Sequence, residues 1–408
     1  MRITTYFLSL SIVLFVSCKT ADLRNYPFPK PVDTTSKPIE LQEKRSYGLD
    51  GIVADNLFDG ARMNNFEQTA VNAFRVTISP ENQPINMSPY YAFRLWSSTA
   101  RAIEIELNYT DGYHRYYPKI SKDGKKWMDV DSTAVRLAKD SVNAFLKLNL
   151  LPQDTLWIAA QELRNSTWVK NWCTIKAKHP NTTFKVIGRS KLGRDLYHLD
   201  ICKGDPEKKP TIVVISRQHP PEVTGYMAME SFVETILDDN PLSAQFLDKY
   251  RVLVFPLMNP DGVDLGHWRH NAGGIDLNRD WQYYHQEEPQ KVGKYIVEEL
   301  NRSKSKVVLG LDFHSTWRDV FYTRTPESQG IKGFHEAWIY GIGESFPDHE
   351  PENASSPLGN PIAASWFYTQ FGAEGITYEV GDNTDRDFIR SKAKMAAIGV
   401  MQLLLYRE

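Results

Sequence analysis

Three side chains that can bind a metal ion follow two separate apolar runs of the sequence. His219 and Glu222 stand in the segment RQHPPEV, directly after the run TIVVIS, and His314 follows the run VVLGLDF. Two imidazoles and one carboxylate are a typical ligand set for a catalytic zinc ion whose fourth position stays open for water. A turn stiffened by Pro220 and Pro221 can direct the first and fourth residues of H-x-x-E at one point. An isolated H-x-x-E pattern arises often by chance, so the prediction of one Zn²⁺ site depends on the residues around it.

Further groups with suitable chemistry lie between and after these ligands. The glycine-rich segment 257–281 begins at the end of an apolar run, and we predict a long functional loop there rather than a core element. It contains Arg269 and Arg279, with Asn278 beside the latter, and arginine binds carboxylates through two parallel hydrogen bonds. Glu379 interrupts the apolar run GITYEV, where a carboxylate is costly unless it has a partner or a role. Next to a metal-activated water it would serve as the general base.

The elements that would position these groups are predicted from apolar runs that alternate with helical patterns. The near-continuous runs indicate strands covered on both faces, and the helical patterns show one apolar face or a suitable first residue. We predict strands over 211–216, 251–258, 307–313 and 375–380, and helices over 222–239, 290–301 (after Pro289) and 391–406 (with Ser391 as N-cap). This alternation predicts an α/β fold with a mixed, largely parallel central sheet flanked by helices. Ligands bind such sheets at the carboxyl ends of the strands, which is where the polar residues stand.

The first half of the chain has a different pattern. Short runs rich in aromatic and β-branched residues are separated by turn signals such as TDG and KDG, without helical periodicity. This predicts an all-β sandwich. We therefore divide the chain into a β-sandwich domain over 46–175 and a catalytic domain over 180–408. Cys173 and Cys202 lack the spacing of a metal site, and we expect free thiols.

The N-terminus is predicted to be a targeting segment. Arg2 precedes the apolar stretch 6–16, which is too short to span a membrane but has the length of a signal-peptide core. The ending FVSC resembles a bacterial lipobox, in which Cys18 becomes the lipidated first residue. We expect a signal peptide over 1–18, a polar tether over 19–45, and an exported lipoprotein of the bacterial periplasm or outer membrane, held at the membrane by its lipid. An ordinary signal peptide or an uncleaved anchor is the alternative.

Composition sets further limits. The 408 residues suffice for two domains with separate cores, and 41% hydrophobic and 24% charged residues are typical of a globular protein. The formal net charge of −2 argues against an overall basic surface, so we expect no nucleic-acid partner. We also expect a monomer.

In order along the chain, the motifs resemble those of the zinc carboxypeptidase (carboxypeptidase A-like) family. These motifs are H-x-x-E, N-P-D-G, W-R, D-L-N-R-x-W, D-F-H and a glutamate in a strand, over about 180–408. RQHPPE, PLMNPDGV, DLNRDW and DFHS are most similar to the branch of cytosolic carboxypeptidases and their bacterial relatives. That branch has an N-terminal β-sandwich, which matches the expectation for the first half.

The resemblance implies a zinc site. It assigns His219, Glu222 and His314 to one Zn²⁺ ion, the ligand set known from carboxypeptidase A. It also places Asp276 behind His219, where a carboxylate orients the imidazole ring.

The resemblance implies four further roles. Glu379 would be the general base that activates a zinc-bound water, and later the proton shuttle to the leaving amine. Arg269 would polarise the scissile carbonyl and hold the oxyanion. Asn278 and Arg279 would bind the terminal carboxylate of the substrate.

The sequence departs from the family pattern at the substrate pocket. Pro357 stands where many members have a mobile tyrosine. The positions at the base of the pocket fall near Ala364 and Ser365, which are small and uncharged and argue against a preference for basic C-terminal residues. Arg386 and Arg390 could line the pocket and favour acidic residues, but the segment DRDFIR is also typical of a solvated helix start.

The leading hypothesis is a zinc-dependent metallocarboxypeptidase that removes C-terminal residues from peptides with a free carboxylate. One alternative keeps the site but acts as an amidohydrolase on cell-wall stem peptides or acyl-amino acids. The other is a catalytically inactive surface lipoprotein that binds a ligand, against which the complete residue set speaks.

Overall fold

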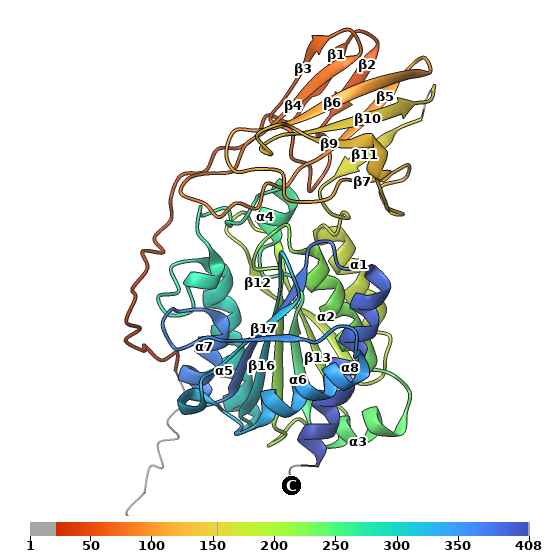
Figure 1. The fold of residues 1–408 in the computed structure, drawn as a ribbon. Helices are drawn as coiled ribbons and strands as arrows, with labels where there is room; N and C mark the ends of the chain where they lie inside the picture. The colour runs from red at the N-terminus through yellow and green to blue at the C-terminus, as the bar shows by residue number, and fades with distance from the viewer. Residues whose placement is uncertain (1–21, 153, 407–408) are drawn as a thin grey trace, which may run out of the picture.

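The computed structural model describes residues 22–152 and 154–406, so the predicted signal peptide with Cys18 lies outside the described residues. Within these ranges the strands form three sheets, of six, five and eight strands. Figure 1 shows the two smaller sheets together at one end of the molecule, here called the β half, and the large sheet with its helices at the other, here called the α/β half.

The large sheet is mixed, with four parallel strands at its centre. Its order is β12-β13-β15-β14-β16-β19-β17-β18, in which β15, β14, β16 and β19 are parallel and β12 and β13 pair antiparallel with their neighbours. Strand β17 pairs antiparallel with β19 and parallel with β18. The strands are β12 (Thr182–Arg189), β13 (Asp195–Ile201), β14 (Thr211–Ser216), β15 (Arg251–Phe255), β16 (Val307–Thr316), β17 (Val320–Thr323), β18 (Glu352–Ser355) and β19 (Glu374–Gly381). The predicted α/β fold with a mixed, largely parallel central sheet flanked by helices is confirmed.

Helices cover both faces of this sheet. Alternate residues of β14 point to opposite sides, so Ile212 and Val214 pack with α2, α3, α6 and α8, and Val213 and Ile215 pack with α5 and α7. The helices are α1 (Ser166–Lys176), α2 (Val223–Ile236), α3 (Pro241–Lys249), α4 (Pro260–Leu265), α5 (Glu287–Ser303), α6 (Phe334–Ser345), α7 (Ala363–Phe371) and α8 (Arg386–Leu405), with the short 3₁₀ helices η1 (Ser132–Ala134), η2 (Leu277–Arg279) and η3 (Pro326–Ser328).

Two predicted helix starts were wrong. Ser391 is not an N-cap, because α8 already begins at Arg386, where the Asp385 side chain accepts a hydrogen bond from the backbone N–H of Phe388. Helix α5 begins at Glu287, two residues before Pro289.

The β half consists of two sheets that pack around one core. The six-stranded sheet has the order β1-β2-β5-β11-β7-β8, and the five-stranded sheet has the order β3-β4-β6-β10-β9. Leu95 and Ile158 of the first sheet share a hydrophobic cluster with Phe74 and Ile105 of the second. The strands are β1 (Ser46–Leu49), β2 (Ile52–Asp55), β3 (Asn65–Ala70), β4 (Ala73–Ile78), β5 (Ala92–Ser97), β6 (Arg101–Tyr109), β7 (Lys119–Ser121), β8 (Met128–Asp129), β9 (Val135–Leu137), β10 (Ala144–Leu150) and β11 (Leu156–Ala159).

Residues 22–45, predicted as part of a polar tether, lie against the folded protein instead. Figure 1 shows this segment running along the side of the α/β half toward the β half. The Thr34 hydroxyl is buried and donates to Asp280 Oδ1 at 2.6 Å, and the Lys37 N–H donates to the Gly273 carbonyl at 2.8 Å. The prediction overlooked that a proline-rich extended segment can satisfy its polar groups on a neighbouring surface.

The segment 257–281, predicted as a loop, contains α4 and η2 and is largely buried. It lies between the two halves of the molecule, as the position of α4 in Figure 1 shows. We expected this segment to lie outside the core. That expectation was wrong, because the β half covers the segment and buries it.

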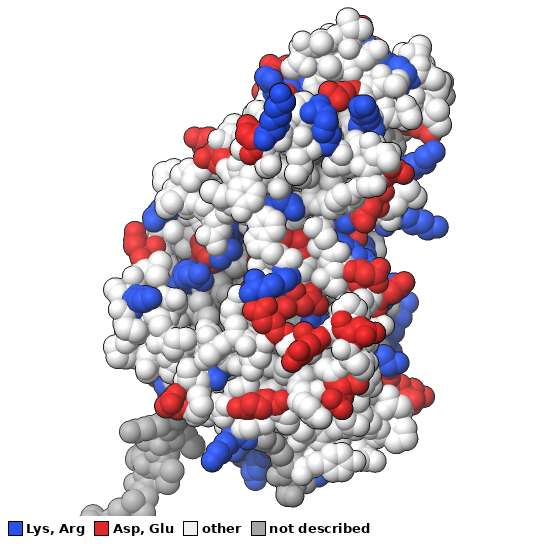
Figure 2. Space-filling model, in the orientation of Figure 1, with Lys and Arg blue, Asp and Glu red and all other residues white. Residues whose placement is uncertain are grey.

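The surface in view in Figure 2 has acidic and basic side chains interspersed, with acidic ones gathered across the middle of the lower half. None of the helices in the described residues is both long and apolar enough to cross a bilayer. Cys173 and Cys202 are both free, as predicted.

Candidate metal centre

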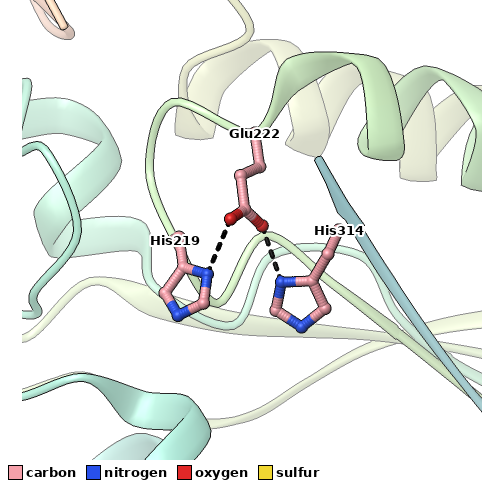
Figure 3. Close-up of side chains that lie close together, drawn as sticks. All are labelled: His219, Glu222 and His314. Atoms are coloured by element: carbon pink, nitrogen blue, oxygen red, sulfur yellow. Dashed lines mark hydrogen bonds and ion pairs between the residues drawn. The ribbon is translucent and has the colours of Figure 1, made fainter. Parts of the chain in front are cut away.

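His219, Glu222 and His314 converge at the carboxyl ends of two adjacent parallel strands, β14 and β16. Glu222 Oε1 lies 2.8 Å from His219 Nδ1, and Glu222 Oε2 lies 2.6 Å from His314 Nδ1. Figure 3 shows the carboxylate between the two rings, with both Nδ1 atoms turned toward it. One ligand atom from each of the three side chains lies within 4.8 Å of the others, and all three residues are buried. The structure thus brings together the three predicted ligands.

A second carboxylate lies behind each imidazole. His219 Nε2 is 2.8 Å from Asp276 Oδ1, the partner that the resemblance implied, and His314 Nε2 is 2.8 Å from Asp312 Oδ2, which sequence reasoning missed. A ring that donates its Nε2–H to a carboxylate presents an unprotonated Nδ1 on the other side.

This geometry tests whether the residues present fit a metal ion. Two Nδ1 lone pairs and the Glu222 carboxylate would repel one another at these distances unless protons or a cation lay between them. The three donors are borderline and hard atoms of the kind that zinc prefers, and the backing carboxylates fix both rings in the metal-binding tautomer. The site therefore fits a single Zn²⁺ ion.

Arg217 stabilises the turn between β14 and α2 through hydrogen bonds of its side chain. Its backbone has a φ of 57°, an unusual value for a residue with a side chain, so the chain reverses sharply before His219. The buried guanidinium donates to the Pro220 carbonyl at 2.6 Å and to the Arg164 carbonyl at 3.2 Å. The first bond satisfies a carbonyl group of a turn that has two prolines and few backbone donors of its own, and the second ties the turn to the segment before α1.

Gln218 connects three motifs that lie far apart in the sequence. Its Nε2 donates to Asp312 Oδ2 at 2.8 Å, and its Oε1 accepts a hydrogen bond from Trp281 Nε1 at 2.8 Å. It therefore ties the H-x-x-E turn to the D-F-H strand and to the tryptophan of D-L-N-R-D-W. The sequence alone does not indicate this role, because the residue is neutral and has no motif of its own.

Glu379 lies beside the metal ligands. In the register of β16 and β19 it is paired with His314, and both side chains line the same cavity. Its Oε2 atom is buried and has no hydrogen-bond partner among the described residues. Burial raises the pKa of Glu379 to about 8 in the metal-free protein, and Glu222 and Asp312 raise it too, while His314 opposes them. A divalent cation nearby would lower this pKa again, toward a value suited to a base.

The arginine and asparagine residues meet through Asp276. Arg269 donates from Nε to Asp276 Oδ2 at 2.9 Å, and the Arg279 Nη1 atom lies 3.8 Å from the same oxygen. Burial alone would raise the pKa of Asp276, but Arg269 and His219 hold it well below its ordinary value. Asn278 accepts from the Ala363 N–H at 2.8 Å and has its amide nitrogen 3.2 Å from His314 Nε2. Arg279, the more exposed of the two arginines, is therefore better placed than Asn278 to bind a carboxylate from solution.

The three metal ligands line one cavity of about 400 Å³ together with Arg269, Asn278, Arg279 and Glu379. The β half forms part of the wall of this cavity. Arg115 of the β half is fixed by Asp382, with Nε and Oδ2 2.8 Å apart, and its guanidinium lies 4.8 Å from the centre of the Trp317 ring. Trp317 also stacks on Tyr113, with ring centres 5.9 Å apart and planes inclined by 18°. The residues that the β half contributes to the lining are Asn86, Met87, Ser88, Tyr113 and Arg115. No local pattern in the sequence indicated this wall.

The residues considered for the substrate pocket lie in different places. Pro357 does not line the cavity, whereas Tyr322 of β17 does. Ala364 and Ser365 are buried in α7 and do not reach the cavity.

The arginines that could have favoured acidic residues are engaged elsewhere. Arg386 donates to both carboxylate oxygens of Glu162, at 2.9 and 3.0 Å, and Arg390 pairs with Asp387 on the surface. Neither lines the cavity, so the interpretation of DRDFIR as a helix start was the correct one.

Gly225 allows α2 to approach His314 closely. A Cβ atom at Gly225 would lie 2.2 Å from the His314 carbonyl oxygen, and the Gly225 N–H donates to Ser315 Oγ at 2.8 Å. We expect Gly225→Ala to push α2 and β16 apart, which would cost about 1–3 kcal/mol of stability and about 10- to 100-fold in zinc affinity. Zinc affinity by competition with a chelator and the melting temperature measure both effects.

Gly341→Ala in α6 is the matched control, because within the described residues nothing lies within 4 Å of a Cβ at that position. It should keep zinc affinity and gain up to about 1 kcal/mol of stability, since alanine favours helix. A Gly225→Ala protein with normal zinc affinity and melting temperature would show that this close approach does not support the ligand.

Sequence comparisons agree with this geometry. Residues 169–318 match the family model described as zinc carboxypeptidase. An uncharacterized protein of Zymomonas mobilis is 26% identical over 237 residues, which cover 55% of this chain and 58% of that protein. Cytosolic carboxypeptidase 2 of Xenopus tropicalis is 36% identical over 103 residues, 24% of this chain and 11% of that protein. The matched regions thus span only part of these relatives' lengths.

Solved structures share the fold of both halves. A metallo-carboxypeptidase from Burkholderia cenocepacia has a TM-score of 0.71 at 18% identity, covering 87% of this chain and 100% of that one. A metallo-carboxypeptidase from Pseudomonas aeruginosa, solved in complex with (2-guanidinoethylmercapto)succinic acid, has a TM-score of 0.70 at 18% identity, covering 86% and 98%. The order of the motifs, the converged ligand residues and the match over residues 169–318 all point to the zinc carboxypeptidase family.

Proposed function

We propose that this protein is a zinc-dependent metallocarboxypeptidase that hydrolyses the C-terminal peptide bond of peptides with a free carboxylate. The observation that supports this best is that one cavity contains the three metal ligands, two arginines and the Glu379 carboxylate, whose Oε2 has no hydrogen-bond partner among the described residues. Each of these groups has a separate task in the hydrolysis of a terminal peptide bond.

Zinc, when bound by His219, Glu222 and His314, would supply a Lewis acid that makes water more acidic and polarises a carbonyl. Glu379 would accept the proton that the attacking water loses, because its carboxylate faces the ligands without another partner among the described residues. The same carboxyl group would then give this proton to the leaving amine.

The two arginines would bind different groups of the substrate, on either side of the scissile bond. The Arg269 guanidinium is held by Asp276 beside the ligands, where it can donate to the oxygen of the scissile carbonyl as negative charge develops. Arg279 is partly exposed in the same cavity and would bind the terminal carboxylate, which selects the last peptide bond of the chain.

Mass spectrometry on peptide substrates tests this proposal. The zinc-loaded protein should shorten a mixed peptide library by single residues from the carboxyl end, and a chelator should stop the reaction. Internal cleavage would contradict the exopeptidase assignment. Release of amino acids from muropeptides or acyl-amino acids, with peptides left intact, would favour an amidohydrolase instead.

Arg279→Ala should weaken the preference for a free carboxyl terminus. Because the guanidinium would make a charge-assisted hydrogen bond of about 1.5–3 kcal/mol, we expect kcat/KM for free-acid peptides to fall by about 10- to 100-fold. The value for the same peptides with an amidated terminus should change little. The measurement is the ratio of kcat/KM for the free-acid peptide to kcat/KM for the amidated peptide. An equal loss on both substrates would mean that Arg279 does not bind the terminal carboxylate.

A further inference from the structure

The short segment that contains Arg269 is fixed by the β half on one side and faces the cavity on the other. Trp268 is fully buried in the hydrophobic core of the β half, and its indole Nε1 donates to the Tyr90 carbonyl at 3.1 Å. Two residues before it, a Cβ at Gly266 would lie 2.3 Å from the Ala61 carbonyl oxygen, so the two backbones nearly touch. Residues 266–270 are therefore packed into the β half although they belong to the sequence of the α/β half.

One buried carboxylate of the β half binds this segment through its backbone. Glu81 follows β4 and is fully buried. Its Oε2 accepts from the Trp268 N–H at 2.8 Å, and its Oε1 accepts from the N–H groups of Arg269 and His270 at 3.0 and 2.6 Å. Three consecutive N–H groups directed at one anion form a strong, directional set of charge-assisted bonds.

The charge on Glu81 suits this arrangement. Burial raises the pKa of a carboxyl group, but His267, Arg62 and the backbone N–H groups reverse that effect and bring the pKa of Glu81 below its ordinary value. The ionised carboxylate, which accepts hydrogen bonds and donates none, is therefore the stable form.

On the opposite side of the same three residues, the Arg269 side chain points into the cavity. Its Nε and Nη2 lie 2.9 and 2.8 Å from Asp276 Oδ2, and Asp276 also holds His219. The guanidinium is thus fixed at its tip by Asp276 and at its backbone by Glu81. A displacement of Asp276 or of Glu81 would move the Arg269 guanidinium relative to the metal ligands.

We propose that Glu81 is a positioning residue for catalysis: by binding the backbone of residues 268–270, the β half sets the place of the Arg269 guanidinium at the scissile carbonyl. The β half is then a structural part of the active site rather than an independent binding module. This inference rests on the role proposed for Arg269 under the proposed function.

Glu81→Gln keeps the size of the side chain but places an amide N–H₂ against backbone N–H donors. The segment must shift to relieve this, and a shift of about 1 Å at a group that contacts the transition state costs about 100-fold in rate. We expect kcat of the full, zinc-loaded protein to fall by about 10- to 100-fold, with KM changed by less than about twofold and zinc content unchanged. Glu43→Gln, at an exposed glutamate before β1, should behave like the wild type.

A double-mutant cycle separates positioning from general damage to the fold. In an Arg269→Ala background, Glu81→Gln should have little further effect on kcat, because the group that it positions is absent. Affinity for a peptide phosphonate, which mimics the tetrahedral oxyanion, should fall with kcat/KM in Glu81→Gln, while affinity for a simple dicarboxylate that uses Arg279 stays constant. A merely structural role would leave the two mutations additive and the two ligands equally affected.

If Glu81→Gln does not fold, Glu81→Asp provides the same test, since it keeps the buried charge but is too short to reach all three N–H groups. Additive effects, or normal kcat in either variant, would overturn the positioning role while an active wild type leaves the proposed function standing. A wild type without peptidase activity would instead remove the proposed function. The position of the Arg269 guanidinium in crystals of the variant would then decide the positioning role alone.

Discussion

Glu379→Gln is expected to retain bound zinc and to lower kcat by about 10²- to 10⁴-fold, the usual contribution of a general base. The amide has nearly the same shape as the carboxylate, and Glu379 is not one of the three ligands, so the metal site should stay intact. What the variant loses is the role that we assign to this side chain, the acceptance of the water proton and its transfer to the leaving amine. Steady-state kinetics together with zinc content by mass spectrometry measure both halves of the prediction.

The pH profile provides a second measure of the same change. A base must be ionised to act, so wild-type kcat/KM should fall as the pH drops through the pKa of Glu379 in the zinc-loaded protein. Burial raises the pKa of Glu379 to about 8 in the metal-free protein, and a bound zinc ion would lower it. In Glu379→Gln this acid limb should disappear. Glu298→Gln, at an exposed glutamate of α5, is the control and should leave the rate and profile unchanged. A Glu379→Gln protein with a near-normal rate would exclude Glu379 as the base.

Arg269→Ala is expected to lower kcat by about 10²- to 10³-fold with only a small change in KM, the usual cost of removing one oxyanion donor. The donor acts on charge that develops in the transition state, so substrate binding should depend on it weakly. Because Arg269 also holds Asp276 behind His219, zinc affinity has to be measured in the same variant, and kinetics should be recorded at saturating zinc.

Arg390→Ala, which removes a guanidinium from a surface pair with Asp387, controls for loss of a positive charge. It should leave kcat and KM unchanged. If Arg269→Ala raised KM and left kcat intact, Arg269 would be a substrate-binding group, and the oxyanion role would have to be assigned to another donor.

The central part of the site was predictable because its signals are local. Strands covered on both faces have near-continuous apolar runs, so their ends and the polar residues that follow them can be located from the sequence. His219, Glu222, His314 and Glu379 all stand at such places, and the structure places them together.

Asp312 was missed although its signal was present. It lies two residues before His314 in β16, and side chains at that spacing share one face of a strand, so the carboxylate was bound to lie near the imidazole. Asp276 was expected only through the family resemblance, because its position behind His219 arises from the path of a long connection. Gln218 has no charge and no motif of its own, and only its three-dimensional contacts show what it connects.

The contribution of the β half could not be predicted from local patterns. The hydrogen bonds from residues 268–270 to Glu81 join positions nearly half the chain apart, and nothing in either segment specifies its partner. The same holds for Thr34, whose contact with Asp280 makes residues 22–45 part of the folded protein. Packing between distant segments decides such contacts, and a single sequence does not show it.

Anomalous diffraction at the zinc absorption edge tests the central claim most directly. The account predicts one strong peak per chain, about 2.0–2.2 Å from the Nδ1 atoms of His219 and His314 and from the Glu222 carboxylate. Glu379 should face this peak without binding it. A peak elsewhere in the chain, or none at this site in zinc-saturated crystals, would contradict the account.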